Sequence, residues 1–130
     1  MARQLWPDYD PDEISDALTA ILRSSIEAAF LLRNDEQLAV GFINLSLRYD
    51  LIPGATQKPV AYVEGVYTCP EFRRQGLGKL LIEQAEVWAQ QQGCAELTAD
   101  VSDDNLASIS FHKQVGFEQI NRIVTFIKHI

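Results

Sequence analysis

One acidic residue stands inside an otherwise apolar stretch of the chain. Glu64 lies within the sequence Ala-Tyr-Val-Glu-Gly-Val-Tyr, residues 61–67. A carboxylate buried in such a strand is costly unless it is paired or used, and burial would raise its pKa and make it a better base near neutral pH. Glu64 is therefore a candidate general base. The alternatives are that it binds a cationic amine or forms a buried ion pair with an arginine.

A loop rich in glycine and positive charge follows this stretch. It reads Arg73-Arg74-Gln75-Gly76-Leu77-Gly78-Lys79 and leads into a run with helical periodicity. Its two glycines allow a tight turn and a close approach of the backbone to a ligand, and the free N–H groups of a helix start attract an anion. We expect these seven residues to bind a pyrophosphate, with a solvated basic helix start as the plain alternative. The spacing matches neither the three-glycine dinucleotide motif nor the Walker A motif.

The elements that would position these groups follow from periodicity and turn residues. A helix is expected to begin near Asp10. The expected strands cover 27–33, 38–49, 60–68 and 95–101, with one or two closing strands in 117–130, and further helices cover 77–93 and 103–116. This order predicts a mixed α/β domain with an antiparallel front half and a βαβ back half. The almost wholly apolar strand 60–68 would be central and buried on both faces.

Shorter patterns refine this outline. The residues Asn34-Asp35-Glu36 favour a hairpin turn, and Gly41 marks a possible β-bulge. Asp103 or Asp104 is expected to cap the helix that follows.

Composition narrows the function classes. With 130 residues, 47% of them apolar, the chain fits one domain, residues 1–130, with one core. The net charge of −7 argues against a nucleic-acid interface; it suits a cationic partner or simply keeps the protein soluble. No apolar run approaches the roughly 18 residues of a membrane span. Two cysteines imply no disulfide framework, and no metal-binding motif occurs, so we expect a cytoplasmic protein without a metal.

Two motifs together resemble the GNAT superfamily of N-acetyltransferases. The first is Arg73-x-x-Gly76-x-Gly78; the second is Asn105-x-x-Ser108 followed by His112 and Val115-Gly116-Phe117. A closer resemblance, to the aminoglycoside 6'-N-acetyltransferases, covers nearly the whole chain. It rests on residues 5–8, 40–44, 46–48, 63–67 and 83–89.

The resemblance implies a GNAT acyl-CoA N-acyltransferase fold and acetyl transfer from acetyl-CoA to the 6'-amine of a polycationic sugar antibiotic. The amine would attack the thioester directly, with Glu64 as base. The backbone of Val66, Tyr67 and Thr68 would bind the pantetheine arm, and an N–H near Val66 could hold the thioester oxygen as negative charge develops. Asn105 and Ser108 would contact the CoA arm, although Asn105 could serve only the helix start.

The resemblance also suggests residues for the acceptor. It places a substrate-binding acid at Asp100, at a strand end where α/β proteins bind ligands. Trp6 and Tyr49 could form aromatic walls of a sugar pocket, or belong to the core, and Glu118 is a weaker acidic candidate. His112 stands where many members of the superfamily carry a tyrosine that protonates the leaving thiolate. It could do that work, or be structural.

The start of the chain departs from the usual pattern. Relatives usually carry an extra strand and helix before the block that begins at Leu5, so the fold is expected to be shortened at its N-terminus. An uncovered sheet edge would favour a homodimer. Two other functions stay open: acetylation of another amine, such as a polyamine, a small metabolite or a peptide, and a non-catalytic CoA-binding domain.

Overall fold

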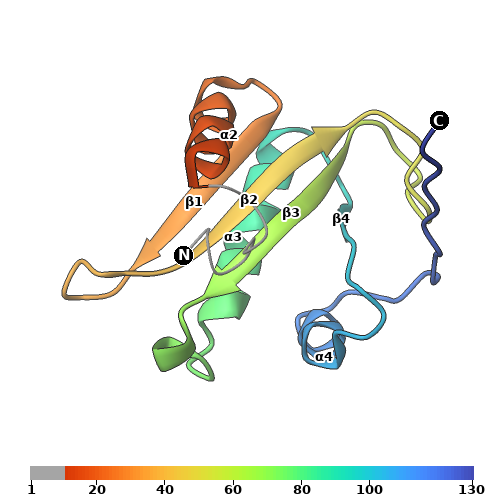
Figure 1. Cartoon of the computed structure of the whole chain (residues 1–130). Coiled ribbons are helices and arrows are strands. Elements are labelled where there is room, and N and C mark those ends of the chain that lie inside the picture. Colours follow the sequence, from red (N-terminus) through yellow and green to blue (C-terminus); the bar gives the residue numbers. More distant parts are fainter. Residues whose placement is uncertain (1–10) are drawn as a thin grey trace.

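A computed structural model describes residues 11–130 (Figure 1). Trp6 and the cap expected at Asp10 lie outside the described residues, as do the side chains of residues 11, 13–15, 17 and 18. The elements run in the order α2 (Pro11–Arg23), β1 (Glu27–Arg33), β2 (Ala39–Arg48), β3 (Val60–Thr68), the 3-10 turn η1 (Pro70–Phe72), α3 (Leu77–Gln91), β4 (Leu97–Ala99) and α4 (Leu106–Gln114).

The four described strands form one mixed sheet in the order β1-β2-β3-β4. β1 and β2, and then β2 and β3, pair antiparallel, whereas β3 and β4 pair parallel across the α3 crossover. The expected hairpin turn is confirmed, because Asn34 Oδ1 accepts hydrogen bonds from the backbone N–H groups of Glu36 and Leu38. A bulge lies at Val40, beside Gly41, where the register with β1 shifts. The mixed antiparallel and βαβ arrangement predicted from the sequence is therefore confirmed.

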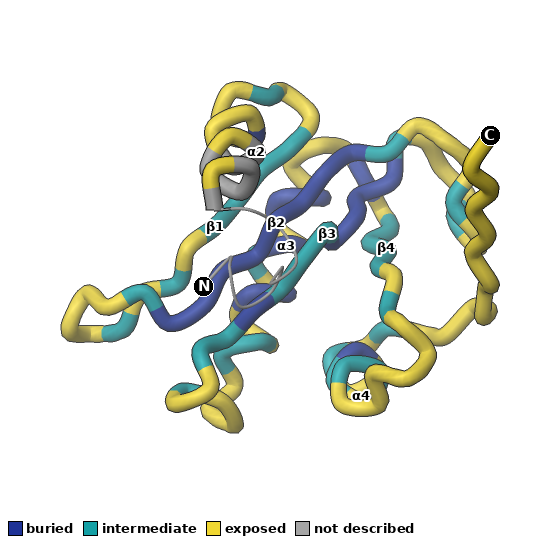
Figure 2. The backbone as a smooth tube through the Cα atoms, viewed as in Figure 1, coloured by how far each residue is buried: buried dark blue, intermediate teal, exposed yellow. Residues whose placement is uncertain are grey.

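The main core lies between the sheet and α3, which runs behind it in Figure 1. Alternate residues of a strand point to the same face, so β2 and β3 can present an apolar row to the helix. Its buried members are Ile43, Leu45, Leu47, Ala61 and Val63 from the strands, with Leu81, Ile82, Ala85, Trp88 and Ala89 from α3 and Cys94 after it. Figure 2 shows this buried band running along β2 and β3. Burial of each large side chain here stabilises the fold by about 1.5–3 kcal/mol.

The opposite face of β2 carries a polar row. Asn44, Ser46 and Arg48 alternate with the core residues. Asn44 and Ser46 are buried, and Asn44 Oδ1 finds no hydrogen-bond partner among the described residues. α2 packs on β1, on this side of the sheet in Figure 1. The side of β2 that does not contribute to the core is thus available for chemistry.

β3 contains a β-bulge at Glu64. Asn44 is opposite Gly65 and Leu45 is opposite Val63, so Glu64 has no partner of its own on β2. The extra residue shifts the alternation of side chains, because Val66 packs against the core whereas Tyr67 lies beside Phe42 on the other face. Bulges re-aim side chains and are frequent near active sites. β3 is central as expected, but residues 64–66 and 68 are only half-buried, so the expectation of burial on both faces is wrong there.

Two expectations for the second half of the chain need correction. β4 spans only Leu97–Ala99, not 95–101, because its pairing with β3 is limited to residues 61–63 of that strand. No strand forms in residues 117–130, where one or two were expected. A strand needs a neighbouring ladder, and Ile120 instead packs against Gly54 in the β2–β3 loop. Figure 1 shows this C-terminal segment running beside that loop.

Within the described residues, no helix has the length and apolar character needed to cross a membrane.

Candidate active site

β3 and β4 separate where β3 reaches its bulge. Their parallel pairing ends at Val63 and Ala99, and beyond these residues the two strands diverge (Figure 1). Among the described residues, the second half of β3 therefore has a strand neighbour only on its β2 side.

The direction of the backbone N–H and C=O groups along β3 follows from their alternation between the two sides of the strand. The N–H of Cys69 donates to Val40 O, so the peptide groups of Tyr67, two residues earlier, also point toward β2. Those of Val66 and Thr68 then point the other way, toward the gap. The Thr68 carbonyl confirms this direction, because it accepts a hydrogen bond of 3.0 Å from Arg73 Nε. The backbone of Val66 and the N–H of Thr68 can thus bind an extended ligand arm between the strands, while the Thr68 carbonyl is held by Arg73.

The loop that follows β3 leads into the N-terminus of α3. Gly76 caps this helix in the left-handed conformation, with φ of 76°, and no side chain supplies a capping hydrogen bond. The first turn holds no acidic residue. The first N–H groups of this 15-residue helix are therefore left for an external anion. Arg73, Arg74, Gln75 and Lys79 are exposed around it.

The helix α4 borders the same region. A Cβ built on Gly78 would lie 2.6 Å from Phe111 Cε1, so the first turn of α3 and the middle of α4 are in close contact. Ser108 precedes Phe111 by three residues and shares its side of α4. The structure thereby brings Ser108 toward the glycine loop. It also corrects the expected cap, because Asn105, rather than Asp103 or Asp104, accepts the hydrogen bond from Ser108 N.

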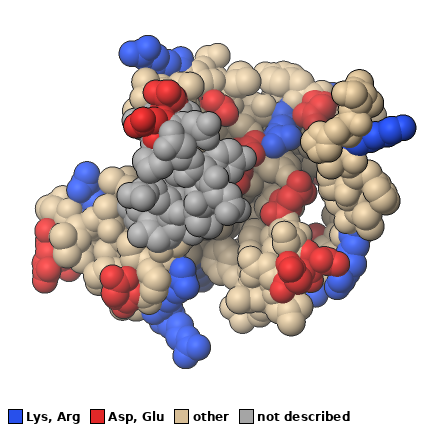
Figure 3. All heavy atoms as spheres, viewed as in Figure 1, with Lys and Arg blue, Asp and Glu red and all other residues tan. Residues whose placement is uncertain are grey.

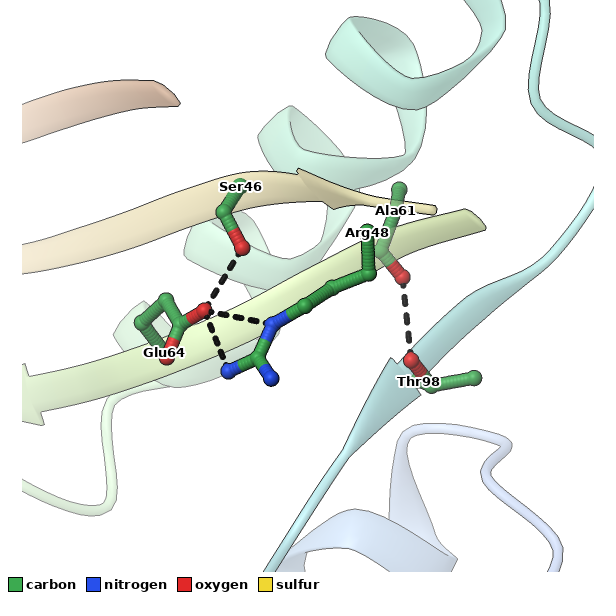
Figure 4. A network of polar contacts seen from close by, with 5 residues as sticks. All are labelled: Ser46, Arg48, Ala61, Glu64 and Thr98. Atoms are coloured by element: carbon green, nitrogen blue, oxygen red, sulfur yellow. Dashed lines mark hydrogen bonds and ion pairs between the residues drawn. The ribbon is translucent and has the colours of Figure 1, made fainter. Parts of the chain in front are cut away.

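Glu64 sits in a polar network on the sheet face opposite α3 (Figure 4). Its Oε1 accepts hydrogen bonds from Ser46 Oγ at 2.6 Å, from Arg48 Nη2 at 2.7 Å and from Arg48 Nε at 3.1 Å. The ion pair is partly buried, with side chains 35% exposed for Arg48 and 27% exposed for Glu64. The alternative of an ion pair with an arginine is therefore what the structure contains, and the partner is Arg48.

Tyr62 and Asp100 extend this network toward β4. The Arg48 guanidinium lies over the Tyr62 ring, 4.1 Å from its centroid. Burial, followed by the hydrogen bond and charge of Asp100, raises the pKa of the Tyr62 phenol. Burial lowers the pKa of Arg48, but the hydrogen bond and charge of Glu64, together with Tyr62 and Asp50, raise it overall. Asp100 is exposed just beyond β4. This face thus gathers two carboxylates around one paired cation.

His112 is buried on α4. Its Nδ1 lies 2.7 Å from the Ser108 carbonyl oxygen, which can only accept, so Nδ1 carries the proton in this contact. The ring also packs between Phe111 and Phe117. In the neutral tautomer, Nε2 is then an acceptor, and His112 can give up a proton there only as the imidazolium. The structural role considered for this residue is present, whereas its role as an acid stays a prediction.

Two further residues expected to bind the acceptor, Tyr49 and Glu118, are distant from Glu64 in the sequence. Tyr49 is 57% exposed just after β2, and Glu118 is exposed in the C-terminal segment. Figure 3 shows acidic side chains around the opening between the sheet and the C-terminal segment, and basic side chains projecting at the lower end, where the loop into α3 lies in Figure 1.

Sequence reasoning did not assign Ser46, Arg48 and Tyr62 to the site. The signal was present, because Ser46 and Arg48 on one strand, like Tyr62 and Glu64 on the next, lie two positions apart and therefore share a face. What the sequence did not show was the register, which the bulge at Glu64 shifts by one residue.

Comparison with known proteins decides the family. Residues 1–117 match the acetyltransferase (GNAT) family. The chain belongs to this family. The acetyltransferase is 40% identical over 124 residues to an aminoglycoside N(6')-acetyltransferase type 1 of Serratia marcescens, covering 95% of this chain and 85% of the relative. It is 35% identical over 130 residues to one of Acinetobacter genomosp. 13, covering 100% and 88%.

Solved structures agree with this assignment. AAC(6')-Iy, in complex with the bisubstrate analogue CoA-S-monomethyl-acetylneamine, superimposes with a TM-score of 0.94 at 32% identity, covering 100% of the acetyltransferase and 88% of that chain. AAC(6')-Ih from Acinetobacter baumannii gives a TM-score of 0.90 at 32% identity, covering 99% and 87%. The GNAT fold and an acetyltransferase similar to the aminoglycoside 6'-N-acetyltransferases, both predicted from the motifs, are confirmed.

Proposed function

We propose that this acetyltransferase, as a single domain over residues 1–130, moves an acetyl group from acetyl-CoA to the 6'-amine of an aminoglycoside, and so confers resistance to such antibiotics. Binding of acetyl-CoA is supported by the divergence of β3 and β4 beside the N-terminus of α3, which has no side-chain cap. The pantetheine arm binds the backbone of Val66 and the N–H of Thr68. The pyrophosphate binds residues 73–79, and Asn105 and Ser108 lie along the arm. Support for this donor comes from AAC(6')-Iy, which was crystallised with CoA.

The proposal of an aminoglycoside acceptor rests on the negative charge of the protein and on the names of its relatives. Glu64 and Asp100 lie on one face of the sheet, and the chain as a whole carries a net charge of −7. Such a field attracts and binds a polycation. The relatives at 35–40% identity are named for acetylation of the 6'-nitrogen of aminoglycosides. Trp6, Tyr49 and Glu118 are further candidates for contact with the sugar rings.

In the proposed reaction, Glu64 accepts one proton from the ammonium of the acceptor, directly or through water. The neutral amine nitrogen then attacks the thioester carbonyl carbon, and the C–N bond forms while the C–S bond breaks. The N–H near Val66 stabilises the developing oxyanion. The second nitrogen proton leaves as the amide forms, and the CoA thiolate gains a proton, from His112 as imidazolium or from solvent. Holding the two substrates together supplies much of the rate.

The test follows release of free CoA from acetyl-CoA with a thiol reagent. Kanamycin and tobramycin are compared with spermidine, a lysine peptide and no acceptor. Turnover confined to the aminoglycosides is expected. Turnover only with spermidine or the peptide would overturn the acceptor class, and binding of CoA without turnover of any amine would favour a non-catalytic domain.

The role of Glu64 is tested with Glu64→Gln. Loss of a general base lowers kcat on the order of 10²- to 10⁴-fold while CoA affinity is kept. Glu83→Gln, on the exposed side of α3, is the matched control and should keep wild-type turnover. Wild-type turnover by Glu64→Gln would contradict the base role.

We also propose that the protein acts as a homodimer. The C-terminal segment exposes large apolar side chains, with Val124 at 79%, Phe126 at 88% and Ile127 at 82% exposed. Large apolar side chains exposed on one segment favour an interaction site, and a second copy of the chain is the proposed partner. Sedimentation should give twice the chain mass, and Phe126→Asp should give the monomer. Val87→Asp, on α3, is the control at another exposed apolar residue; a wild-type monomer would contradict the proposal.

A further inference from the structure

The three hydrogen bonds to Glu64 all converge on one of its two oxygens. Ser46 Oγ and both donating nitrogens of Arg48 bind Oε1. Arginine and a carboxylate often pair side by side, with one N–H on each oxygen. Here Nε and Nη2 of Arg48 both bind the same oxygen instead. Oε2 receives no hydrogen bond from the described residues, although a carboxylate oxygen can accept two.

The position of Arg48 is fixed from three sides. β2 holds its backbone opposite Val60, the Tyr62 ring lies beneath its guanidinium, and Glu64 binds its end. Tyr62 is itself buried and held next to Asp100. A planar guanidinium that stacks on a ring has little freedom to turn its fork onto the second oxygen. The pairing of both N–H groups with one oxygen is therefore a property of the sheet face.

Because of the bulge, Glu64 is not paired with a residue of β2. The hydrogen bonds that the structure gives its carboxylate are those at Oε1. If those contacts were lost, the carboxylate could rotate, because a terminal carboxylate torsion has broad minima.

We propose that Arg48, with Ser46, is a positioning residue that holds Glu64 by Oε1 and thereby presents Oε2 to the acceptor amine. The inference rests on the proposed function, in which Glu64 is the base. Oε2 accepts the proton from the acceptor ammonium, and the freed nitrogen lone pair forms the C–N bond as the C–S bond breaks. Arg48 exchanges no proton and touches no reacting atom. A pair with one N–H on each oxygen would leave neither oxygen free of an arginine donor.

A double-mutant cycle tests whether Arg48 acts through Glu64. The variants are Arg48→Met, Glu64→Gln and the double variant, assayed for kcat and KM with the best amine and for CoA affinity. Arg48→Met alone should lower kcat on the order of 10²-fold, as expected for a misplaced catalytic group. In the Glu64→Gln background the same change should cost less than about 2-fold, because no base remains to be positioned.

Further variants separate positioning from folding. Arg48→Lys keeps the charge but has no fork, and should recover only part of the loss; Ser46→Ala should cost less than Arg48→Met because two of the three bonds remain. Arg23→Met, at the exposed end of α2, removes the same charge and should keep wild-type activity. CoA affinity and the thermal midpoint of each variant show that it is folded. If Arg48→Met does not fold, the cycle is run with Arg48→Lys.

The outcomes distinguish the two proposals. Losses that simply multiply in the double variant would overturn the positioning role and leave Glu64 as base. Full activity of Arg48→Met would do the same. Full activity of Glu64→Gln in an active acetyltransferase would overturn the base and the positioning role together, and so would a wild-type protein that acetylates no amine.

Discussion

Gly78 and Phe111 meet so closely that a Cβ at residue 78 would lie 2.6 Å from one edge atom of the ring and 2.9 Å from the next. This contact joins the first turn of α3 to α4, although the two helices are separated by β4 in the sequence. It also changes the meaning of the second glycine of the loop. Its missing side chain is required for helix packing, whereas Gly76 is the glycine that makes the tight turn, with φ of 76° and open space around it.

Replacement of Gly78 by alanine should destabilise the protein by about 1–3 kcal/mol, because the ring must move to accommodate the new methyl group. CoA affinity should fall as well, since α4 is pushed away from the loop. Urea unfolding and CoA titration check both effects. The double variant with Phe111→Leu should regain part of the stability; no regain would show that the ring is not the obstacle.

Variants of Asn105 can test whether this residue only caps α4 or also contacts CoA. Asn105→Ala should cost about 1 kcal/mol of folding stability, because Ser108 N loses its side-chain acceptor. Asn105→Asp keeps a capping oxygen and should restore stability. CoA titration of both variants is decisive for the second role. Wild-type affinity in the folded Asn105→Ala protein would limit this residue to the helix start.

Glu96 should make folding stability depend on pH. Backbone and hydroxyl hydrogen bonds from Thr56, which ties the β2–β3 loop to the residues before β4, lower the pKa of Glu96 below its ordinary value of 4.5. A lowered pKa in the folded state gives stability that is present above the unfolded value and lost as the pH falls through the folded value. Urea midpoints should therefore show Glu96→Gln less stable than wild type at neutral pH, with the gap closing in acid. A gap that widens in acid would contradict this.

The two thiols should differ in reactivity. Cys94 is buried against the carbonyl of Pro59, and burial raises the pKa of its thiol, whereas Cys69 is half-buried near the glycine loop. Because the thiolate is the reactive form, a thiol reagent should modify Cys69 first and Cys94 only after unfolding. Counting thiols in Cys69→Ala and Cys94→Ala, native and in denaturant, checks the order; fast reaction of Cys94 in the native protein would contradict it.

Local patterns in the sequence were enough for most elements. The bounds of β3 were predicted as residues 60–68, and the helix expected over 77–93 is found as α3, Leu77–Gln91. These features depend on neighbours in the chain, such as a run of apolar residues or a glycine after a helix. The closing strand in 117–130 was wrong because strand formation depends on a partner ladder, which apolar character alone does not supply.

In the candidate site, too, local features could be predicted from the sequence, whereas pairings between strands could not. Glu64 was singled out because a charge in an apolar strand is visible in sequence, and the arginine pair was considered. The identity of Arg48 as its partner depends on the register between β2 and β3, and that register changes within the strand. A one-residue shift decides which side chains face each other, so the pair could not be chosen without the structure.

The bulge at Glu64 has a consequence for how this enzyme can diverge. It divides β3 into two halves that would recognise ligands differently in the proposed function. The residues up to Glu64 would contact the acceptor through side chains, so substitutions there would change which amine is bound. Residues Gly65 to Thr68 would contact the donor through peptide groups, whose N–H every residue except proline provides. Under that proposal, new acceptors can evolve by changes in the first half of one strand while the acetyl donor site is kept unchanged.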